Sequence, residues 1–514
     1  MKRYFLGIDI GTFESRGILT DESFRVAADA SLPHGMNNPQ PGWFEQEAEA
    51  VWWGDLCKLC RTLIKQSGIR PEQIACVGTS ALGTDCLPVD EQCRPLRPAI
   101  LYGIDARASE EAAWLTEHYG QARVQELFGH PICSGDTATK ILWLRRHEPE
   151  IYAKTAYFLT GSSFLTARLT GKYVIDQSLA KGSFRPLYQA DGSVNEAECG
   201  LYCRPDQIAA CAWSTDIVGT VTPEAAAQTG LAAGTPVITG TGDSTAEAIS
   251  VGLVEPGTAF FQYGSSMFYY YCTDHFVGSY VSPQGNGALK GGKAFTVPGT
   301  YCLGDGTNAA GTLTRWVRDL LYSKELDAEK QGGENAYAVM AREAAAVPPG
   351  SDGLIMLPYI YGERSPLQDA EATGMLFGLK GTHGRAQINR AALEAVGYST
   401  YQHLLLFEEL GVPPRRIITA GGGTKNAAWM QIICDMAGMP LTIPEPFQCS
   451  SYGDAMLAAL GVGALESFAA LRAALPQGRI LQPDRKNHEF YQEHYPIFRD
   501  LYLENRDRMH RMQK

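Results

Sequence analysis

An acid, a glycine turn and a hydroxyl stand together near the start of the chain, in Asp9-Ile-Gly-Thr12. The pattern predicts a strand over residues 4–10 and a return strand over residues 15–19, which carries Arg16. A glycine turn exposes backbone N–H groups, and the Thr12 hydroxyl adds a donor for a phosphate oxygen. Asp9 is placed to hold Mg²⁺ through its water shell, and Arg16 supplies positive charge. An ordinary hairpin with an aspartate in its turn accounts for the same residues.

A similar turn opens the second half of the chain. Gly264 and Ser265 stand between predicted strands over residues 258–263 and 268–272. Aligning Gly11 with Gly264 sets one glycine–hydroxyl turn over the other, as a duplicated domain would. Two such turns, one in each half, could hold a triphosphate from both sides of a cleft.

Asp243 follows a predicted strand over residues 235–239 and precedes a predicted helix over residues 244–251. An acid at this point lies at the positive end of a helix dipole. Aspartate is also a common helix cap, so a structural role explains the residue equally well. Its place near the predicted domain boundary favours function, because ligand sites favour clefts between domains.

A third glycine turn follows a predicted strand over residues 416–419. It reads Gly421-Gly422-Gly423, with Asn426 three residues later, and it lets the backbone approach a flat ligand such as adenine. The chain has neither the G-x-G-x-x-G pattern in this turn nor a Walker motif anywhere. A nucleotide enzyme without those motifs suggests the actin-like ATPase fold, in which two hairpin turns contact the phosphates.

The elements that must position these turns alternate between strand and helix in both halves, which predicts an α/β fold. The chain has 514 residues, enough for two large domains. We expect an N-terminal domain over residues 1–250, a C-terminal domain over residues 251–480 and a helical tail over residues 481–514.

Composition narrows the class of partner. The net charge is −12, from 44 basic and 56 acidic residues, which argues against nucleic acid or an anionic membrane as a partner. No apolar run has the length of a signal peptide or a membrane span. The 13 cysteines include Cys57-x-x-Cys60, but no second pair stands at zinc-site spacing. These features predict a protein of the reducing cytoplasm.

Two longer segments carry a family resemblance. Gly135-Asp-Thr-Ala-Thr-Lys140-Ile-Leu-Trp143 and Gly374-Met-Leu-Phe-Gly-Leu379 resemble the two signatures of the FGGY carbohydrate kinases. The block Pro358-Tyr-Ile-Tyr-Gly-Glu-Arg364 between them is similar to one in the same family. The matches run in order from residue 9 to about residue 463.

The resemblance implies two actin-like (ribonuclease-H-like) ATPase domains that flank a catalytic cleft, with ATP and Mg²⁺ as cofactors. It makes Asp243 the general base and gives Asp9 and Asp243 to the magnesium site. It also implies a set of ATP contacts: Thr12, Arg16, Gly264, Ser265, Gly311, Gly422 and Asn426. A sugar hydroxyl is a poor nucleophile, so a carboxylate that accepts its proton suits phosphoryl transfer.

The sugar pocket departs from the pattern usual in xylulokinases. Gly83 and Thr84 replace a Met-His pair, and Asp85 follows them. Asp85 could bind sugar hydroxyls, and it could equally cap the end of a strand. The block Leu101–Arg107 resembles xylulokinases, so we expect a ketopentose, xylulose ahead of ribulose, with other ketoses and sugar alcohols left open.

Two other classes compete with a kinase. An actin-like sugar-binding protein without catalysis would lack the base or the magnesium acid, and both Asp243 and Asp9 are present. A chaperone-type ATPase needs a peptide-binding domain, and only about fifty residues follow residue 463. The family resemblance is compatible with a homodimer.

Overall fold

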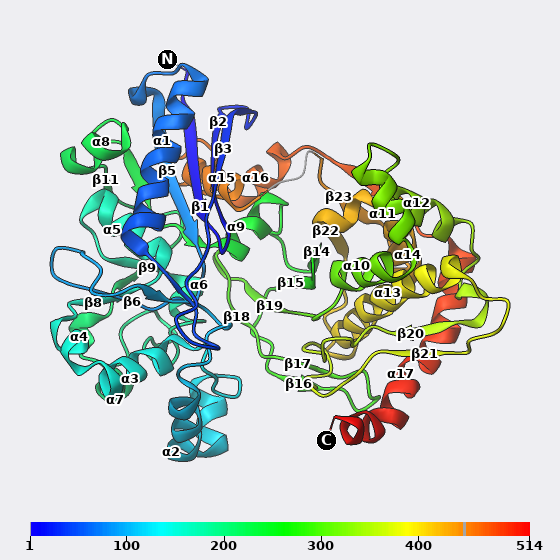
Figure 1. Ribbon diagram of the computed structural model, residues 1–514. Helices are drawn as coiled ribbons and strands as arrows, with labels where there is room; N and C mark the ends of the chain where they lie inside the picture. Colours follow the sequence, from blue (N-terminus) through cyan, green and yellow to red (C-terminus); the bar gives the residue numbers. More distant parts are fainter. Residues whose placement is uncertain (1, 446–448, 514) are drawn as a thin grey trace. The chain divides into compact units, whose positions relative to one another are not determined.

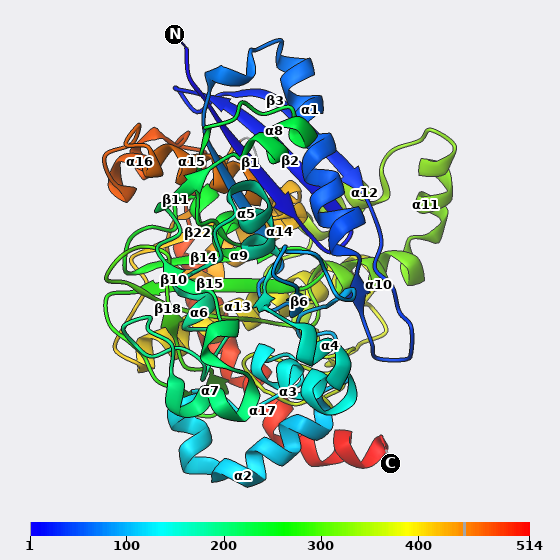
Figure 2. The same ribbon diagram turned by 90° about the vertical axis from the view of Figure 1, so that its left-hand side faces the viewer.

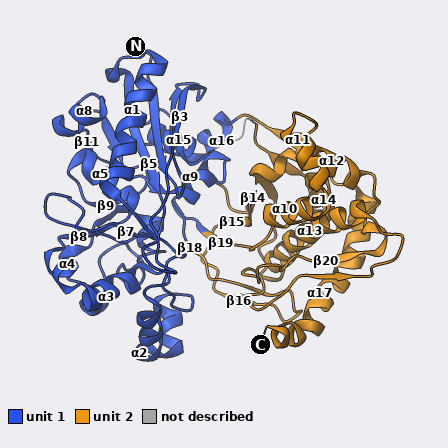
Figure 3. Ribbon diagram, in the orientation of Figure 1, with its two compact units in different colours: residues 1–254, 293–301, 448–475 blue, residues 255–292, 302–447, 476–514 orange. Residues whose placement is uncertain are grey.

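The computed structural model describes residues 2–445 and 449–513, and its contacts divide the chain into two compact units (Figure 3). Unit 1 comprises Met1–Val254, Lys293–Tyr301 and Gln448–Leu475, and unit 2 comprises Glu255–Gly292, Cys302–Phe447 and Pro476–Lys514. Residues 293–301 and 448–475 therefore belong with the N-terminal unit, although the sequence placed them in residues 251–480. Residues 481–514 are part of unit 2 and do not form a separate tail.

Unit 1 is built on a twisted sheet with the strand order β11-β12-β5-β1-β2-β3 (Figure 1). These strands are β1 (Tyr4–Ile10), β2 (Glu14–Asp21), β3 (Val26–Pro33), β5 (Ile74–Ala81), β11 (Ile217–Thr220) and β12 (Pro236–Ile238). Strand β1 pairs antiparallel with β2 and parallel with β5, and β12 pairs parallel with β5 and antiparallel with β11. The short strand β13 (Thr241–Gly242) also pairs with β5, so the segment before Asp243 lies beside the end of that strand.

Unit 2 repeats this topology in the order β19-β15-β14-β22-β23-β24. Its strands are β14 (Thr258–Tyr263), β15 (Met267–Thr273), β19 (Tyr301–Gly306), β22 (Arg416–Ala420), β23 (Leu441–Ile443) and β24 (Arg479–Leu481). Strand β14 pairs antiparallel with β15 and parallel with β22, and β23 pairs parallel with β22 and antiparallel with β24. The predicted α/β fold with two actin-like domains is confirmed, and the hairpin that opens each half leads the same sheet topology.

Helices cover both faces of the sheet in unit 1 (Figures 1 and 2). Successive residues of a strand point to opposite faces. At Gly17 of β2 an added Cβ would meet Leu63 of α1 (Gly54–Ser67), and at Gly7 of β1 it would lie 1.8 Å from the carbonyl oxygen of Ser451 in α15 (Ser450–Gly461). Helix α15 therefore lies directly on the strand backbone, on the face toward which Gly7 and Asp9 point.

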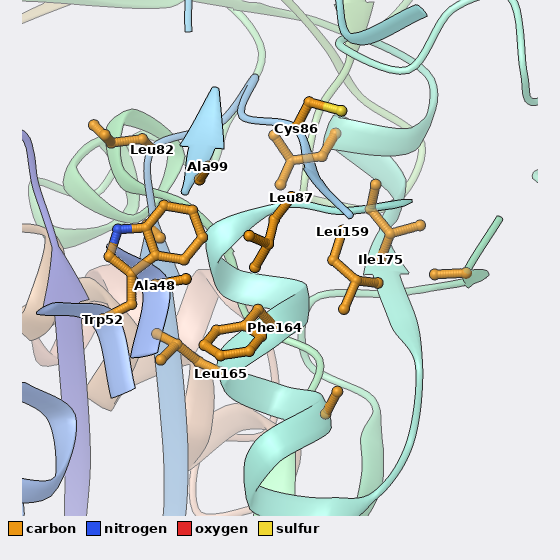
Figure 4. Packing of buried hydrophobic residues seen from close by; sticks show 14 of the residues in the cluster. Ala48, Trp52, Leu82, Cys86, Leu87, Ala99, Leu159, Phe164, Leu165 and Ile175 are labelled. Carbon is orange, nitrogen blue, oxygen red and sulfur yellow. The ribbon is translucent and has the colours of Figure 1, made fainter. Parts of the chain in front are cut away.

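The core of unit 1 supports the first hairpin. The ring of Trp52 packs against that of Phe164 in α5 (Gly161–Thr170), with ring centroids 6.1 Å apart (Figure 4). Trp52 Nε1 donates to Gln46 Oε1 at 2.8 Å, and Gln46 Nε2 donates to the Thr12 carbonyl at 2.8 Å. The turn between β1 and β2 is thereby tied to buried aromatic packing.

The core of unit 2 surrounds the long helix α13 (Arg385–Glu409), which packs against α10 (Gly311–Leu321), α12 (Ala336–Ala345) and α14 (Ala427–Ala437). The last helix, α17 (Arg485–Met512), adds Tyr491, Tyr495 and Phe498 to this core. Among the described helices, none combines the length and the apolar content that crossing a bilayer requires.

Candidate functional site

Asp243 begins helix α9 (Asp243–Ser250) in unit 1, and local backbone geometry holds it there. Gly240 has φ 78°, and a Cβ at this position would lie 2.2 Å from the Thr79 carbonyl oxygen, so the turn requires glycine. Gly242 occupies the cap position, and Asp243 Oδ1 accepts from the N–H of the adjacent Ser244 at 2.6 Å. Asp243 is therefore the first residue of the helix and not its N-cap residue, and its carboxylate bonds to one N–H of the first turn.

The charge of Asp243 acts on other acids of unit 1, among them Asp9 and Asp85. Burial raises the pKa of Asp9 well above its usual value, and the charge of Asp243 raises it further. Burial likewise raises the pKa of Asp85 well above its usual value, with Lys140 lowering it and Asp243 raising it. The pKa of Asp243 itself is raised by burial. Each of these carboxylates makes ionisation of the others less favourable, so a nearby cation would stabilise their ionised forms.

The donor set suits Mg²⁺ bound together with a nucleotide. In residues 2–445 and 449–513 no cluster of three or more His, Cys, Asp or Glu side chains forms a ready-made metal cage. Mg²⁺ does not need one, because it commonly binds through one or two carboxylates, waters and substrate phosphates. Asp9 and Asp243 are two half-buried carboxylates whose charges interact, and they fit that mode.

The first hairpin brings Thr12 and Arg16 to the same end of β1 as Asp9. Arg16 faces Asp9 across the β1–β2 register, and Thr12 Oγ1 lies 3.2 Å from the Tyr102 hydroxyl oxygen. The expected free N–H of the glycine is occupied, because Gly11 N donates to the Glu14 carbonyl at 3.0 Å. The hydroxyl of Thr12, rather than the glycine N–H, is therefore the group of this turn suited to a phosphate oxygen.

The predicted sugar residues lie next to the segment that carries Asp243. A Cβ at Gly242 would lie 3.6 Å from the Cα of Gly83. Lys140 Nζ donates to the Thr84 carbonyl at 2.6 Å and to the Gly135 carbonyl at 3.0 Å, which anchors the loop.

Asp85 is fully buried. The backbone N–H of Tyr102 is close enough to lower the pKa of Asp85, so a sugar contact and a strand-end cap both stay as interpretations of this residue.

The ATP residues predicted in the second half line one cavity of unit 2, of about 590 Å³. These are Gly264, Ser265, Gly311, Gly422 and Asn426. Such a volume is usual for a small-molecule site. Other walls of the cavity come from side chains that the sequence did not single out, among them Arg315, Asn335, Tyr337, Leu393 and Trp429.

The second hairpin closes tightly on helix α10. A Cβ at Gly311 would lie 2.5 Å from the Gly264 carbonyl oxygen, and Gly311 N donates to that oxygen at 2.9 Å. Gly264 N donates to the Ser266 carbonyl at 3.0 Å, so its N–H is occupied, as that of Gly11 is in unit 1. The exposed Ser265 hydroxyl is the counterpart of Thr12.

The three glycines of the third turn have different surroundings. Added Cβ atoms at Gly421 and Gly423 would lie 2.6 Å and 2.8 Å from atoms of Tyr263, whereas nothing lies within 4 Å of one at Gly422. Packing therefore requires two of the glycines and leaves Gly422 open to the cavity. Asn426 caps helix α14 by accepting from Trp429 N at 3.1 Å.

Several residues around Asp9, Asp85 and Asp243 were not predicted from the sequence. Lys140 and Tyr102 are two of them, and both lie inside segments that resemble the family, so the sequence did mark their positions. Ser80 donates to Asp9 Oδ1 at 2.8 Å and also contacts Asp454, which is far away in the sequence. Nothing local marks Asp454 as part of this site.

Comparison with known proteins covers both halves of the chain. Residues 4–250 match the N-terminal domain of the FGGY family of carbohydrate kinases, and residues 263–462 match the C-terminal domain of the same family. The xylulose kinase of Escherichia coli (strain K12) is 29% identical over 501 residues, covering 97% of this chain and 98% of that protein.

Other relatives are almost as similar. The gluconokinase of Bacillus subtilis (strain 168) is 28% identical over 506 residues, covering 98% of this chain and 96% of that protein. The crystal structure of xylulose kinase from Rhodospirillum rubrum superposes with a TM-score of 0.88 at 28% identity, covering 99% of this chain and 100% of that one. The similarity extends over whole chains, but the names of these relatives do not agree on one sugar.

Proposed function

Because this chain belongs to the FGGY family of carbohydrate kinases and is a carbohydrate kinase, we propose that it transfers phosphate from ATP to a ketopentose, xylulose ahead of ribulose. The observation that carries the proposal is Asp243, the first residue of helix α9, whose charge acts on Asp9 and Asp85. Sugar and ATP are the proposed small-molecule partners, and the cytoplasm, where ATP is available, is the proposed location of the reaction.

Asp243 is the proposed general base. Its Oδ1 is held by the Ser244 N–H, and its other oxygen can accept the proton of a sugar hydroxyl as that hydroxyl attacks the γ-phosphorus. Burial raises the pKa of Asp243 and so makes its carboxylate a better proton acceptor. Asp9 and Asp243 would hold Mg²⁺, which offsets negative charge on the phosphates when bound.

The nucleotide is assigned to the cavity of unit 2. Gly422 leaves room for the ligand against the backbone, and the hydroxyls of Thr12 and Ser265 are the proposed phosphate contacts. Arg16, Gly264, Gly311 and Asn426 complete the proposed ATP contacts. Hydroxyl and backbone donors can hold phosphates without a Walker motif.

Charge supports a neutral sugar over a sugar acid. The charge of Asp243 raises the pKa of both Asp85 and Asp9, so the carboxylate of a sugar acid brought beside Asp243 would be repelled. The buried carboxylate oxygens of Asp85 can instead bind the hydroxyls of a polyhydroxylated ketose, beside Gly83 and Thr84. A buried polar group that only the right hydroxyl satisfies discriminates strongly between substrates.

A substrate panel tests the proposal. The purified chain is assayed with Mg-ATP and D-xylulose, D-ribulose, D-gluconate, xylitol or glycerol, and ADP formation is followed by a coupled optical readout. We expect the highest kcat/KM with a ketopentose, at least roughly 10-fold above D-gluconate. A higher kcat/KM with D-gluconate would refute the substrate class, and ADP formation that no sugar increases would refute the proposed reaction.

A further inference from the structure

Two carboxyl groups meet at one serine in unit 1. Ser80 Oγ lies 2.8 Å from Asp9 Oδ1 and 2.7 Å from Asp454 Oδ2. Ser80 is in β5, directly across the parallel register from Asp9 in β1. Asp454 comes from helix α15 and is fully buried. Its second oxygen, Oδ1, has no hydrogen-bond partner in the described part of the chain.

Proton counting sets the direction of these bonds. A serine hydroxyl has one hydrogen to donate. Two ionised carboxylates only accept, so both could bond to Ser80 Oγ only by sharing its one hydrogen in a weaker three-centre bond. Both contacts are short, at 2.8 Å and 2.7 Å, which favours a proton on one of the two carboxyl groups. That carboxyl group then donates to Ser80 Oγ.

The surroundings identify the donor as Asp454. Burial raises the pKa of both acids well above the usual value. Asp454 is fully enclosed by the sheet and its own helix, whereas Asp9 is only half-buried and has Arg16 across the strand pair. The chain of bonds then runs from neutral Asp454 to Ser80 and from Ser80 to Asp9.

We propose that Asp454 is a positioning residue, which acts through Ser80 to hold the carboxyl group of Asp9 in a fixed orientation for the metal–nucleotide complex. Asp454 touches neither substrate nor metal in this arrangement, and the proposal rests on the proposed kinase function. The bond from Ser80 takes up Asp9 Oδ1 and leaves the other oxygen for the water shell of the cation. Groups that orient a metal-binding carboxylate in this way commonly affect metal affinity strongly.

Helix α15 gives the chain of bonds a rigid base. A Cβ at Gly78 of β5 would lie 2.4 Å from the Asp454 carbonyl oxygen, and one at Gly7 of β1 would lie 2.9 Å from the Asp454 Cβ. The helix backbone therefore packs directly on the two strands that carry Ser80 and Asp9. This contact leaves Asp454 little freedom to move away from Ser80.

The test compares Asp454→Asn, Asp454→Ala and Ser80→Ala with the wild-type protein. The amide of an asparagine can still donate to Ser80, whereas alanine cannot. A matched control is Asp55→Ala, because Asp55 is also a buried helix aspartate bonded to a strand serine, with Ser15 Oγ donating to Asp55 Oδ2 at 3.1 Å. That pair makes no contact with Asp9 among the described hydrogen bonds.

The first readout is binding, measured as the affinity of the ATP-loaded protein for Mn²⁺ by electron paramagnetic resonance. We expect Asp454→Ala and Ser80→Ala to weaken Mn²⁺ binding roughly 10-fold. Asp454→Asn should stay within about 2-fold, and Asp55→Ala should leave the affinity unchanged. The KM for sugar should not change in any of these variants.

The second readout is the infrared spectrum of the metal-free protein. The wild-type minus Asp454→Asn difference spectrum should contain a carboxylic-acid C=O band that the wild-type minus Asp55→Ala difference spectrum lacks, since other buried acids such as Glu363 contribute their own bands to every variant. Unchanged Mn²⁺ affinity in both alanine variants, or a difference spectrum of Asp454→Asn without such a band, would overturn the inference. Because neither readout needs sugar turnover, a protein inactive on every sugar would refute the proposed function without deciding this one.

Discussion

Replacing Asp243 by asparagine separates a catalytic role from a structural one. Asparagine keeps the shape of the side chain and an oxygen that can accept from Ser244 N, so the bond of 2.6 Å can persist. The variant loses the negative charge and the capacity to take up a proton. Activity and stability should therefore respond in different ways.

Activity should fall steeply. A positioned general base contributes about 10²- to 10⁴-fold to a rate, which corresponds to about 2.7 to 5.4 kcal/mol in the activation barrier. The loss should appear in kcat, because the proton is transferred as the phosphoryl group moves. The KM for Mg-ATP should rise much less than kcat falls, because the nucleotide cavity is built from residues of unit 2 and the variant weakens only the Mg²⁺ contact of Asp243.

Stability should not fall with activity. Burial raises the folded-state pKa of Asp243 above its usual value, so the stability that its protonated form contributes is lost as pH rises through that pKa. At neutral pH the ionised acid opposes folding, and asparagine removes this effect together with the repulsion of Asp9 and Asp85. The lost interaction with the helix dipole is worth only about 0.3–1 kcal/mol. We expect a Tm within about 3 °C of the wild type or higher.

The assay pairs coupled ADP release with calorimetric melting at pH 7. Asp216→Asn serves as the control, because Asp216 is an exposed acid of unit 1 that accepts from Trp213 N and should tolerate the change. Less than about 10-fold loss of kcat in Asp243→Asn would refute the base assignment. A large drop in Tm without that loss would show that the acid serves the fold instead.

Three further perturbations have distinct outcomes. Gly422→Val should raise the KM for ATP roughly 10-fold with no change in Tm, because the added side chain enters open space in the cavity. Gly423→Ala should lower Tm, because the added Cβ would lie 2.8 Å from Tyr263. Steady-state kinetics and thermal melting check both predictions. Lys140→Met should raise the KM for sugar and not that for ATP, since Thr84 loses its 2.6 Å anchor, and equal changes in both constants would contradict this. Burial raises the pKa of Glu363 to about 8 from 4.5, so its neutral form stabilises the protein at low pH, and this stability is lost as pH rises from about 4.5 to 8. At pH 9, Glu363→Gln should therefore have a higher Tm than the wild type and a free energy of unfolding larger by up to about 4 to 5 kcal/mol. A lower Tm at that pH would contradict the assignment.

Local patterns predicted the parts of the site that are local in the chain. Each hairpin turn combines a glycine and a hydroxyl within two residues, and strand pairing follows directly from that neighbourhood. The open glycine, Gly422, also belongs to a turn that the sequence marks plainly. These patterns did not reveal whether each backbone N–H is free to bind a ligand. The N–H groups of Gly11 and Gly264 both donate to carbonyls of their own turns.

Packing between distant segments decided the rest. The sequence by itself determined two α/β halves with matching turns and an acid at a helix start, because each of these features depends on a few adjacent residues. Only the tertiary structure returned residues 448–475 to unit 1 and brought Asp454 to Ser80, 374 positions away. Such a contact depends on one helix packing on strands at Gly7 and Gly78, and no local pattern at residue 454 records what it will pack against. The orientation of Asp9 is therefore a property of the folded chain.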